Sequence, residues 1–316
     1  METLECIHIT AVGAYAPQLI LTNEELATKV DTSDEWIRSH TGIGKRHIAR
    51  KEETSSDMAV QAVRDLTAKF DVDLLQIDGI IVATATPDFL GFPSTACLVQ
   101  QKLGLQTFPA FDVSAGCTGF IFALETARGM IATGTMSKVL VIGTEKLSSI
   151  VDWEDRNTCV LFGDGAGCVL LERTQEKGGI LDCTLGSQGS GSAALAVTGE
   201  KNAICMDGRA VYAFAVQSIG ETIKKLLADN NLTIEEITWI VPHQANERII
   251  SACAKRFSLP QEKFFLNIEA YANTSAASIP IALSEMVEKD LIQPGNMIIL
   301  IGFGAGLTYG GTLLTW

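Results

Sequence analysis

The chain has 316 residues, of which 47% are hydrophobic and 19% charged, so it can bury a large core and is not a disordered protein. Its formal net charge of −13 repels phosphate backbones and anionic lipid surfaces, so we expect neither a nucleic acid nor a membrane as a partner. The eight cysteines form no CxxC pair, and the N-terminus carries glutamates where a signal peptide carries basic residues. Together these features predict a cytoplasmic protein that handles small molecules.

Apolar runs alternate with longer amphipathic ones along the first half. The expected strands are Cys6–Gly13, Ile77–Ala85, Ala110–Val113, Lys138–Gly143 and Cys168–Glu172, and the expected helices are Glu52–Phe70, Pro93–Leu103 and residues 117–133. This alternation is typical of a sheet with crossover helices. A polar stretch that begins at Glu172 divides the chain into predicted halves 1–173 and 174–316.

The second half repeats the order of the first. Its expected strands are Ile180–Thr184, Ile237–Val241, Phe264–Asn267, Met297–Ile301 and Thr308–Thr315, and its expected helices are Val211–Asp229, Asn246–Phe257 and Ser275–Lys289. Four pairs of segments match between the halves: 77–85 with 237–245, 110–116 with 264–270, 138–144 with 296–302, and 167–171 with 311–315. The pattern indicates an internal duplication of one α/β unit.

The last twenty residues carry no charge and are long enough to span a bilayer, but five glycines interrupt them. We therefore expect two buried strands and a glycine-rich turn there instead.

In open α/β sheets, ligands bind beyond the carboxyl ends of the strands, and Cys117, His243 and Asn273 follow expected strands. Cys117 also begins a helix, where the N-terminal dipole favours an anion and is expected to lower the thiol pKa. An ordinary buried cysteine is an equally good interpretation when this segment is taken alone.

His243 leaves a strand just before Asn246, the expected N-cap of the next helix. Its imidazole suits proton or hydrogen-bond chemistry, although a structural histidine fits the same position. Asn273 precedes a helix that opens in small residues, where it either caps the helix or takes part in a site.

Taken together, the motifs AGCTGF, VPHQAN and NTSAAS resemble those of the β-ketoacyl-acyl-carrier-protein synthase III family, the initiating condensing enzymes of bacterial fatty-acid synthesis. The resemblance extends over the chain through VDTSDEWI, TGIGKRHIA, FPS, DRNT, FGDGAG and GFGAGLTYG. It implies a thiolase-like α/β fold, with two pseudo-symmetric halves in α-β-α-β-α layers.

The resemblance also implies the reaction. Cys117 takes an acyl group from acyl-coenzyme A as a thioester. Malonyl-acyl carrier protein then loses carbon dioxide while His243 and Asn273 donate hydrogen bonds to the enolate oxygen. The backbone N–H groups of Cys117 and Ala305 hold the second oxyanion. No metal and no cofactor are implied.

Further residues match the family's binding sites. The resemblance implies coenzyme A contacts at Trp36, Arg156 and Asn246, an acyl pocket at Phe92 and Phe303, and carrier-protein contacts at Arg248, Lys255, Arg256 and Arg209. Trp36 and Arg156 match the pair that stacks on the two faces of the adenine. The family forms homodimers, in which the residue matching Phe92 reaches into the partner's acyl pocket.

Within the fold, only His243 follows Cys117, which argues against the Cys-His-His chemistry of elongating condensing enzymes, and the terminal glycine turn lacks the second cysteine of thiolases. Two alternatives stay open: a related acyltransferase of secondary metabolism that does not use malonyl-acyl carrier protein, and a non-catalytic acyl-coenzyme A-binding protein. The chain departs from the family's usual residues at His40, Ala213, Ala272 and Ala305.

Overall fold

The apolar strands of the first half form one five-stranded sheet in a computed structural model that describes residues 6–316. The strand order is β1 (Cys6–Tyr15), β7 (Gly165–Thr174), β6 (Lys138–Glu145), β4 (Gly79–Ala83) and β5 (Ala110–Val113). Strands β6, β4 and the edge strand β5 are parallel, while β7 runs antiparallel to β6 and to β1. All five residues of β4 are buried, as a parallel strand covered on both faces requires.

The second half builds a second sheet with the same plan. Its order is β11 (Trp239–Pro242), β12 (Met297–Gly304), β13 (Thr308–Thr315) and β8 (Gly179–Ser187). β11 is parallel to β12, β12 is antiparallel to β13, and β13 is antiparallel to β8, which repeats the directions of β4, β6, β7 and β1. The predicted boundary at residue 173 falls at the end of β7, and the division into two halves there stays a prediction.

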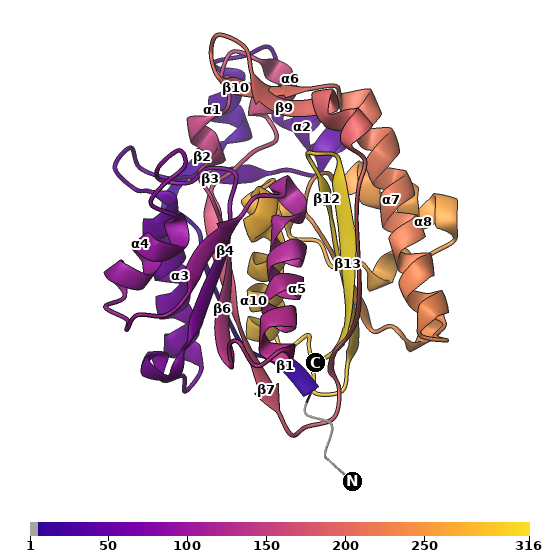
Figure 1. Cartoon of the computed structure of the whole chain (residues 1–316). Helices are drawn as coiled ribbons and strands as arrows, with labels where there is room; N and C mark the ends of the chain where they lie inside the picture. The colour runs from indigo at the N-terminus through magenta and orange to yellow at the C-terminus, as the bar shows by residue number, and fades with distance from the viewer. Residues whose placement is uncertain (1–5) are drawn as a thin grey trace.

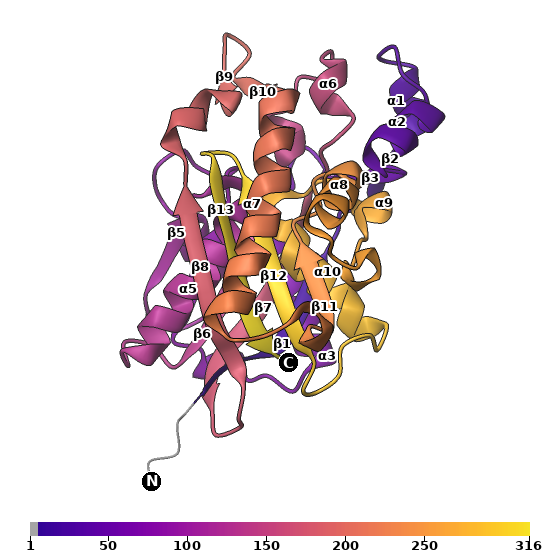
Figure 2. The ribbon, with the colours of Figure 1, turned by 90° about the vertical axis from the view of Figure 1, so that its right-hand side faces the viewer.

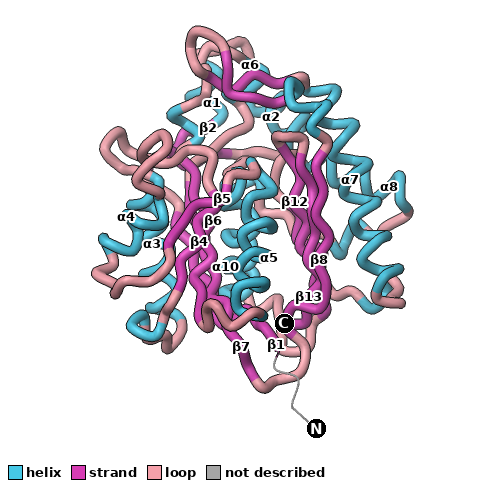
Figure 3. The backbone as a smooth tube through the Cα atoms, in the orientation of Figure 1, coloured by secondary structure: helices cyan, strands magenta, loops and turns pink. Residues whose placement is uncertain are grey.

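Helices cover both faces of both sheets, which gives the expected five layers (Figure 1). The outer helices of the first sheet are α3 (Ser55–Lys69) and α4 (Thr95–Lys102), and those of the second are α7 (Gly208–Asp229) and α8 (Glu247–Phe257), seen from outside in Figure 2. Between the sheets lie α5 (Gly119–Ala132) and α10 (Ser278–Glu288), as Figure 3 shows. Both inner helices contact strands of both sheets.

Smaller elements gather at one end of the sheets (Figure 1). They are α1 (Asn23–Ala27), α2 (Asp34–Thr41), α6 (Arg156–Cys159) and α9 (Ile268–Tyr271), with the two-stranded antiparallel sheet of β2 (Leu19–Thr22) and β3 (Lys45–Ile48) and the hairpin of β9 (Leu195–Thr198) and β10 (Ala203–Met206). The sequence did not indicate the hairpin of β9 and β10. This end carries the site, because β4, β6, β11 and β12 all direct their carboxyl ends toward it.

One predicted strand, Phe264–Asn267, is wrong. The segment makes only an isolated bridge between Phe264 and Ile240. After Phe264, the buried side chain of Gln244 replaces a partner strand. Its NH2 group donates to the Phe265 carbonyl at 3.1 Å, and its oxygen accepts the Asn267 N–H at 3.0 Å. The backbone is thereby satisfied without a ladder and turns into α9.

The uncharged C-terminal stretch forms β12 and β13, as expected. No helix within residues 6–316 is long and apolar enough to cross a membrane.

Candidate active site

Two similar turns bring the halves together at the site. A 3-10 turn, Gly116–Thr118, precedes α5, and a second, Ser275–Ala277, precedes α10. The first residue of each turn has positive φ, 53° at Gly116 and 50° at Ser275. A Cβ on Gly116 would also lie 3.1 Å from that of Ala305, so glycine suits this position for both reasons. The two turns contact each other, which places Cys117 beside the Asn273 segment.

Cys117 lies deep in the protein, with 8% of its surface exposed. Burial, with a smaller contribution from the charge of Glu145, raises the pKa of its thiol to about 11, although hydrogen bonds from the Ser275 hydroxyl and from the backbone at Ala305 and Cys117 lower it. The prediction of a lowered thiol pKa is therefore wrong. It considered the dipole at the N-terminus of the helix but not the burial of the thiol, which has the larger effect. At neutral pH the Cys117 side chain is therefore a neutral thiol.

His243 leaves β11 and extends its pairing, since its backbone N–H donates to the Ile301 carbonyl at 2.7 Å. Its ring lies edge-on to Phe303, with centroids 5.2 Å apart, and its Nδ1 lies 2.7 Å from the Ser278 hydroxyl. Only 1% of the residue is exposed, and burial lowers the imidazole pKa to about 3. At neutral pH the ring is uncharged and carries one proton.

Asn273 is fixed by its backbone and by its own side chain. Its N–H donates to the Leu161 carbonyl and its carbonyl accepts the Gly163 N–H, both at 3.0 Å. The side-chain oxygen accepts the Ser275 N–H at 2.9 Å. With the oxygen held in this way, the amide NH2 group is the part left to face the cavity.

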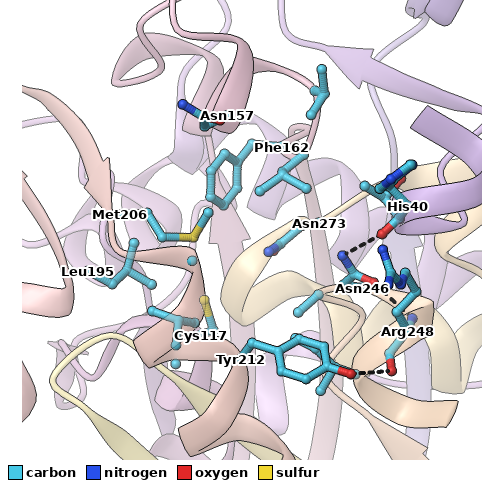
Figure 4. A pocket seen from close by; sticks show the side chains of 18 of the residues that line it. His40, Cys117, Asn157, Phe162, Leu195, Met206, Tyr212, Asn246, Arg248 and Asn273 are labelled. Carbon is cyan, nitrogen blue, oxygen red and sulfur yellow. Dashed lines mark hydrogen bonds between the residues drawn. The ribbon is translucent and has the colours of Figure 1, made fainter. Parts of the chain in front are cut away.

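Cys117, His243 and Asn273 line one cavity of about 240 Å³ (Figure 4). Buried residues form its inner end, and the exposed Tyr212 and Arg248 lie at its other end. The cavity thus joins solvent to the thiol. The structure thus brings the three residues expected to be catalytic into one cavity.

A second cavity of about 70 Å³ lies on another side of Cys117. Its lining is almost wholly apolar and includes Leu147, Ile150, Phe162, Leu195, Val197 and Ile204. Three of these come from the hairpin of β9 and β10, so the sequence analysis missed them. Phe303 lines the larger cavity and not this one, and Phe92 is 89% exposed and lines neither.

Glu145 is a further buried group that the sequence analysis missed. It ends β6, is fully buried, and accepts hydrogen bonds from the Ala85 N–H at 3.1 Å and the Thr86 hydroxyl at 2.6 Å. The Ser275 hydroxyl also bonds to it, so it braces the turn beside Cys117. Burial raises its pKa to about 7. The sequence did not indicate Glu145, because its burial and its contact with Ser275 arise only when distant segments fold together. Ser275 itself lies in the motif NTSAAS.

Comparison with known proteins decides the family. Residues 111–189 match the family described as 3-oxoacyl-[acyl-carrier-protein (ACP)] synthase III, and residues 227–316 match its C-terminal region. The β-ketoacyl-[acyl-carrier-protein] synthase III of Clostridium acetobutylicum is 46% identical over 329 aligned residues, covering 99% of each chain. The crystal structure of 3-oxoacyl-[acyl-carrier-protein] synthase III from Aquifex aeolicus VF5 matches with a TM-score of 0.95 and 46% identity, over 98% of this chain and 100% of that one. The chain belongs to the 3-oxoacyl-[acyl-carrier-protein] synthase III family. It is therefore a thiolase-fold acyltransferase, which confirms the fold, the family and the class of activity expected from the sequence.

The residues that match this family's coenzyme site lie around the outer end of the large cavity. Trp36, His40 and Asn246 line it, and the Arg156 guanidinium lies 4.5 Å from the centre of the Trp36 ring. His40 also stacks on Trp36, with centroids 4.3 Å apart. Arg156 and Trp36 are in direct contact, so stacking on both faces of a base requires Arg156 to move.

Asn246 caps α8 as expected, because its side-chain oxygen accepts the Arg248 N–H at 2.8 Å. Its amide NH2 donates to the His40 carbonyl at 3.1 Å. The side chain thus ties α8 to α2 at the rim of the cavity. Its expected contact with the coenzyme stays a prediction.

The basic residues that match this family's carrier-protein surface are exposed. Arg248, Lys255 and Arg256 lie on α8, and Arg209 lies in the first turn of α7, which packs against α8. None of the four forms an ion pair with another residue of the 6–316 range. Their charges are open to a partner on a protein that is acidic overall.

Proposed function

We propose that this chain condenses an acyl-coenzyme A primer with malonyl-acyl carrier protein to give 3-oxoacyl-acyl carrier protein, the first condensation of fatty-acid synthesis. The observation that carries the proposal is the meeting of Cys117, the His243 ring and the Asn273 amide in one cavity open to solvent. A nucleophile with two side-chain hydrogen-bond donors suits a reaction that passes through a thioester and then an enolate.

In the first step the Cys117 sulfur bonds to the acyl carbon. The carbon–sulfur bond to coenzyme A breaks, and the thiol proton ends on the coenzyme's sulfur. Backbone hydrogen bonds from Cys117 and Ala305 already reach the Cys117 sulfur, which supports them as donors to the oxyanion that forms beside it. Because the resting thiol is neutral, its proton leaves during the transfer.

In the second step malonyl-acyl carrier protein loses its carboxylate as carbon dioxide. The electron pair of the broken bond passes into an enolate, whose oxygen accepts hydrogen bonds from His243 and Asn273. The enolate carbon then attacks the acyl carbon on Cys117. As the new carbon–carbon bond forms, the bond from the acyl carbon to the Cys117 sulfur breaks, and the sulfur leaves as a thiolate that takes a proton from solvent. A neutral imidazole suits this role, because the ring needs only to donate a hydrogen bond and not to transfer a proton.

The primer in this proposal is a short or branched acyl group, held in the apolar cavity of about 70 Å³ beside Cys117. The carrier protein, which is acidic, docks on Arg248, Lys255, Arg256 and Arg209 by charge complementarity. We also propose a homodimer, in which Phe92 reaches the partner's acyl cavity. Its exposure on the loop before α4 supports this placement.

The proposed compartment is the cytoplasm. Cys97 and the six cysteines that follow it are free thiols, as in a reducing environment.

Intact-mass measurement tests the proposal directly. Incubation with a panel of acyl-coenzyme A donors of two to ten carbons should add one acyl group to the wild type and none to Cys117→Ala. Adding malonyl-acyl carrier protein should then give 3-oxoacyl-carrier protein. Absence of acylation with every donor would favour a non-catalytic coenzyme-binding protein.

A second candidate is priming in secondary metabolism. The priming β-ketosynthase of the R1128 polyketide pathway is 33% identical, with a TM-score of 0.91 over 98% of this chain and 96% of that one. A preference for carrier protein and primers of a polyketide pathway, measured in the same assay, would favour it.

A further inference from the structure

Glu145 is a buried carboxylate that the proposed reaction does not use. It ends β6 and is fully buried, and no cation forms an ion pair with it in residues 6–316. The next residue, Lys146, directs its ammonium group to the carbonyls of Arg50, Lys51 and Glu53 instead. A buried carboxylate without a cation is costly, so hydrogen-bond donors must stabilise it.

Three such donors come from the segment that follows β4. The carboxylate accepts the Thr84 hydroxyl at 3.3 Å, the Ala85 N–H at 3.1 Å and the Thr86 hydroxyl at 2.6 Å. Both hydroxyl oxygens already accept a backbone N–H: that of Thr84 accepts Thr86 at 3.0 Å, and that of Thr86 accepts Lys146 at 2.8 Å. Each hydroxyl therefore has its own proton left to donate to Glu145.

Two further donors come from the turn before α10. The Ser275 hydroxyl and the Ala276 N–H bond to the carboxylate. Strand β6 can approach this turn because Gly143 has no side chain, and a Cβ there would lie 2.2 Å from the Ala276 carbonyl oxygen. Gly143 and Glu145 are two residues apart on the strand, so they point to the same face. The Glu145 side chain is thereby directed at the turn.

The two sets of donors belong to two walls of one cavity. Ala85 and Ser275 both line the apolar cavity of about 70 Å³ beside Cys117. The Ser275 wall has other support, since its N–H donates to the Asn273 side chain. The Ala85 side chain is exposed, and in the described part of the chain the Ala85 N–H bonds only to Glu145. This wall is therefore held by the Glu145 hydrogen bonds and not by packing.

We infer that Glu145 is a positioning residue for the primer: by accepting hydrogen bonds from both walls, it fixes the width of the apolar cavity and so helps to select the acyl group. The inference rests on the proposed function, in which the primer lies in that cavity. A carboxylate suits this position because it only accepts hydrogen bonds, whereas a glutamine amide has one oxygen and two N–H donors. In Glu145→Gln several of the donors lose their acceptor.

The ratio of two acylation rates tests this inference. Each enzyme is incubated with isobutyryl- or octanoyl-coenzyme A at pH 8, above the Glu145 pKa of about 7, and acylation of Cys117 is followed by intact mass. We expect Glu145→Gln to shift the ratio toward the octanoyl donor on the order of tenfold, because a displaced wall admits the longer chain. A general loss of folded enzyme lowers both rates equally and leaves the ratio unchanged.

Three threonine variants isolate the contact. Thr86→Val removes the hydroxyl that bonds to Glu145 and should shift the ratio in the same direction by a smaller factor, whereas Thr86→Ser keeps the hydroxyl and should behave as wild type. Thr95→Val is the control, because Thr95 is also buried but its hydroxyl has no partner within residues 6–316. It should leave the ratio unchanged. Equal ratios in Thr86→Val and wild type would overturn the inference.

Hydrogen exchange measures the positioning without any substrate. The amide protons of segments 84–86 and 275–277 should exchange faster in Glu145→Gln than in wild type, and only those of the first segment should do so in Thr86→Val. Unchanged exchange of both segments in Glu145→Gln would overturn the inference, and so would an equal loss of both acylation rates. If Glu145→Gln does not fold, the Thr86 variants decide. If the wild type takes no acyl group from any donor, the proposed function fails, while hydrogen exchange still decides whether Glu145 holds the two walls.

Discussion

The side-chain oxygen of Asn273 accepts the backbone N–H of Ser275, two residues further along the chain, at 2.9 Å. This bond fixes which end of the amide faces the cavity, and it does so with a residue whose φ of 50° is unusual for serine. In the proposed reaction, this turn therefore directs the amide NH2 group of Asn273 toward the enolate oxygen.

Asn273→Asp keeps the shape and the bond to Ser275 but replaces the NH2 donor with an acceptor. We expect malonyl decarboxylation to fall on the order of a hundredfold or more, while acylation of Cys117 stays within about threefold. Release of carbon dioxide and intact mass measure the two steps. A variant that decarboxylates normally would show that Asn273 is only structural.

The buried thiol should react slowly at neutral pH. Because the pKa of Cys117 is about 11, its alkylation by iodoacetamide should rise about tenfold per pH unit up to pH 10. Glu145→Gln removes a charge that raises this pKa and should speed alkylation severalfold, whereas Asp164→Asn, at another buried carboxyl, should not. Peptide mapping follows Cys117 alone. A plateau below pH 8 would contradict the raised pKa.

His243 should make stability depend on pH. Its pKa falls from 6.5 to about 3 on folding, so below pH 6.5 the unfolded state binds a proton that the native state does not. Stability from this group is complete above pH 6.5 and declines as the pH falls. Between pH 7.5 and pH 5, wild type should lose about 2 kcal/mol more free energy of unfolding than His243→Gln. Urea unfolding at both pH values measures this, and equal losses would argue against a buried neutral ring.

Ala272 is strained, because its φ of 58° and ψ of −159° suit glycine alone. Ala272→Gly should raise the free energy of unfolding by about 1 kcal/mol, since relief of strain outweighs the greater freedom of glycine in the unfolded chain. Ala282→Gly is the control, because Ala282 is buried inside α10, and there glycine should destabilise by about 1 kcal/mol or more. Destabilisation by both would mean that the methyl group of Ala272 matters more than its backbone.

Trp36 should contribute to the binding of acyl donors only when the donor carries a nucleotide. Trp36→Ala should raise KM for acyl-coenzyme A on the order of tenfold, because stacking of a base on an aromatic ring contributes about 1–3 kcal/mol. KM for the same acyl group on pantetheine should not change. An equal rise for both donors would place the effect of Trp36 in the fold and not in the stacking.

The sequence located the reactive residues because their positions depend on local order. Cys117 and His243 each follow a strand, and Asn273 follows the segment 264–270, which matches residues 110–116 of the first half. The direction of a strand is readable from apolar runs and glycine turns. The family resemblance added their chemical roles. The repeat of strand order was likewise visible, because equivalent strands carry similar apolar runs.

The features that could not be predicted from the sequence depend on contacts between distant segments. The burial that raises the thiol pKa comes from both halves together. The loss of the strand at residue 264 depends on the Gln244 side chain, and the apolar cavity depends on Leu195, Val197 and Ile204 folding back over Cys117. None of these has a periodic signal along the chain.

The matching turns at Gly116 and Ser275 also bear on how such a site arises. Cys117 and Ala276 occupy the same place in their turns, so the scaffold offers two equivalent positions, of which the proposed mechanism uses one for a nucleophile. A single chain made of two identical units has two equivalent sites, as a symmetric dimer does. Within one chain, however, each unit can change independently, so a functional group that one unit supplies can be lost from the other. In the proposed mechanism, the first half supplies the thiol of Cys117, and the second supplies the hydrogen-bond donors His243 and Asn273.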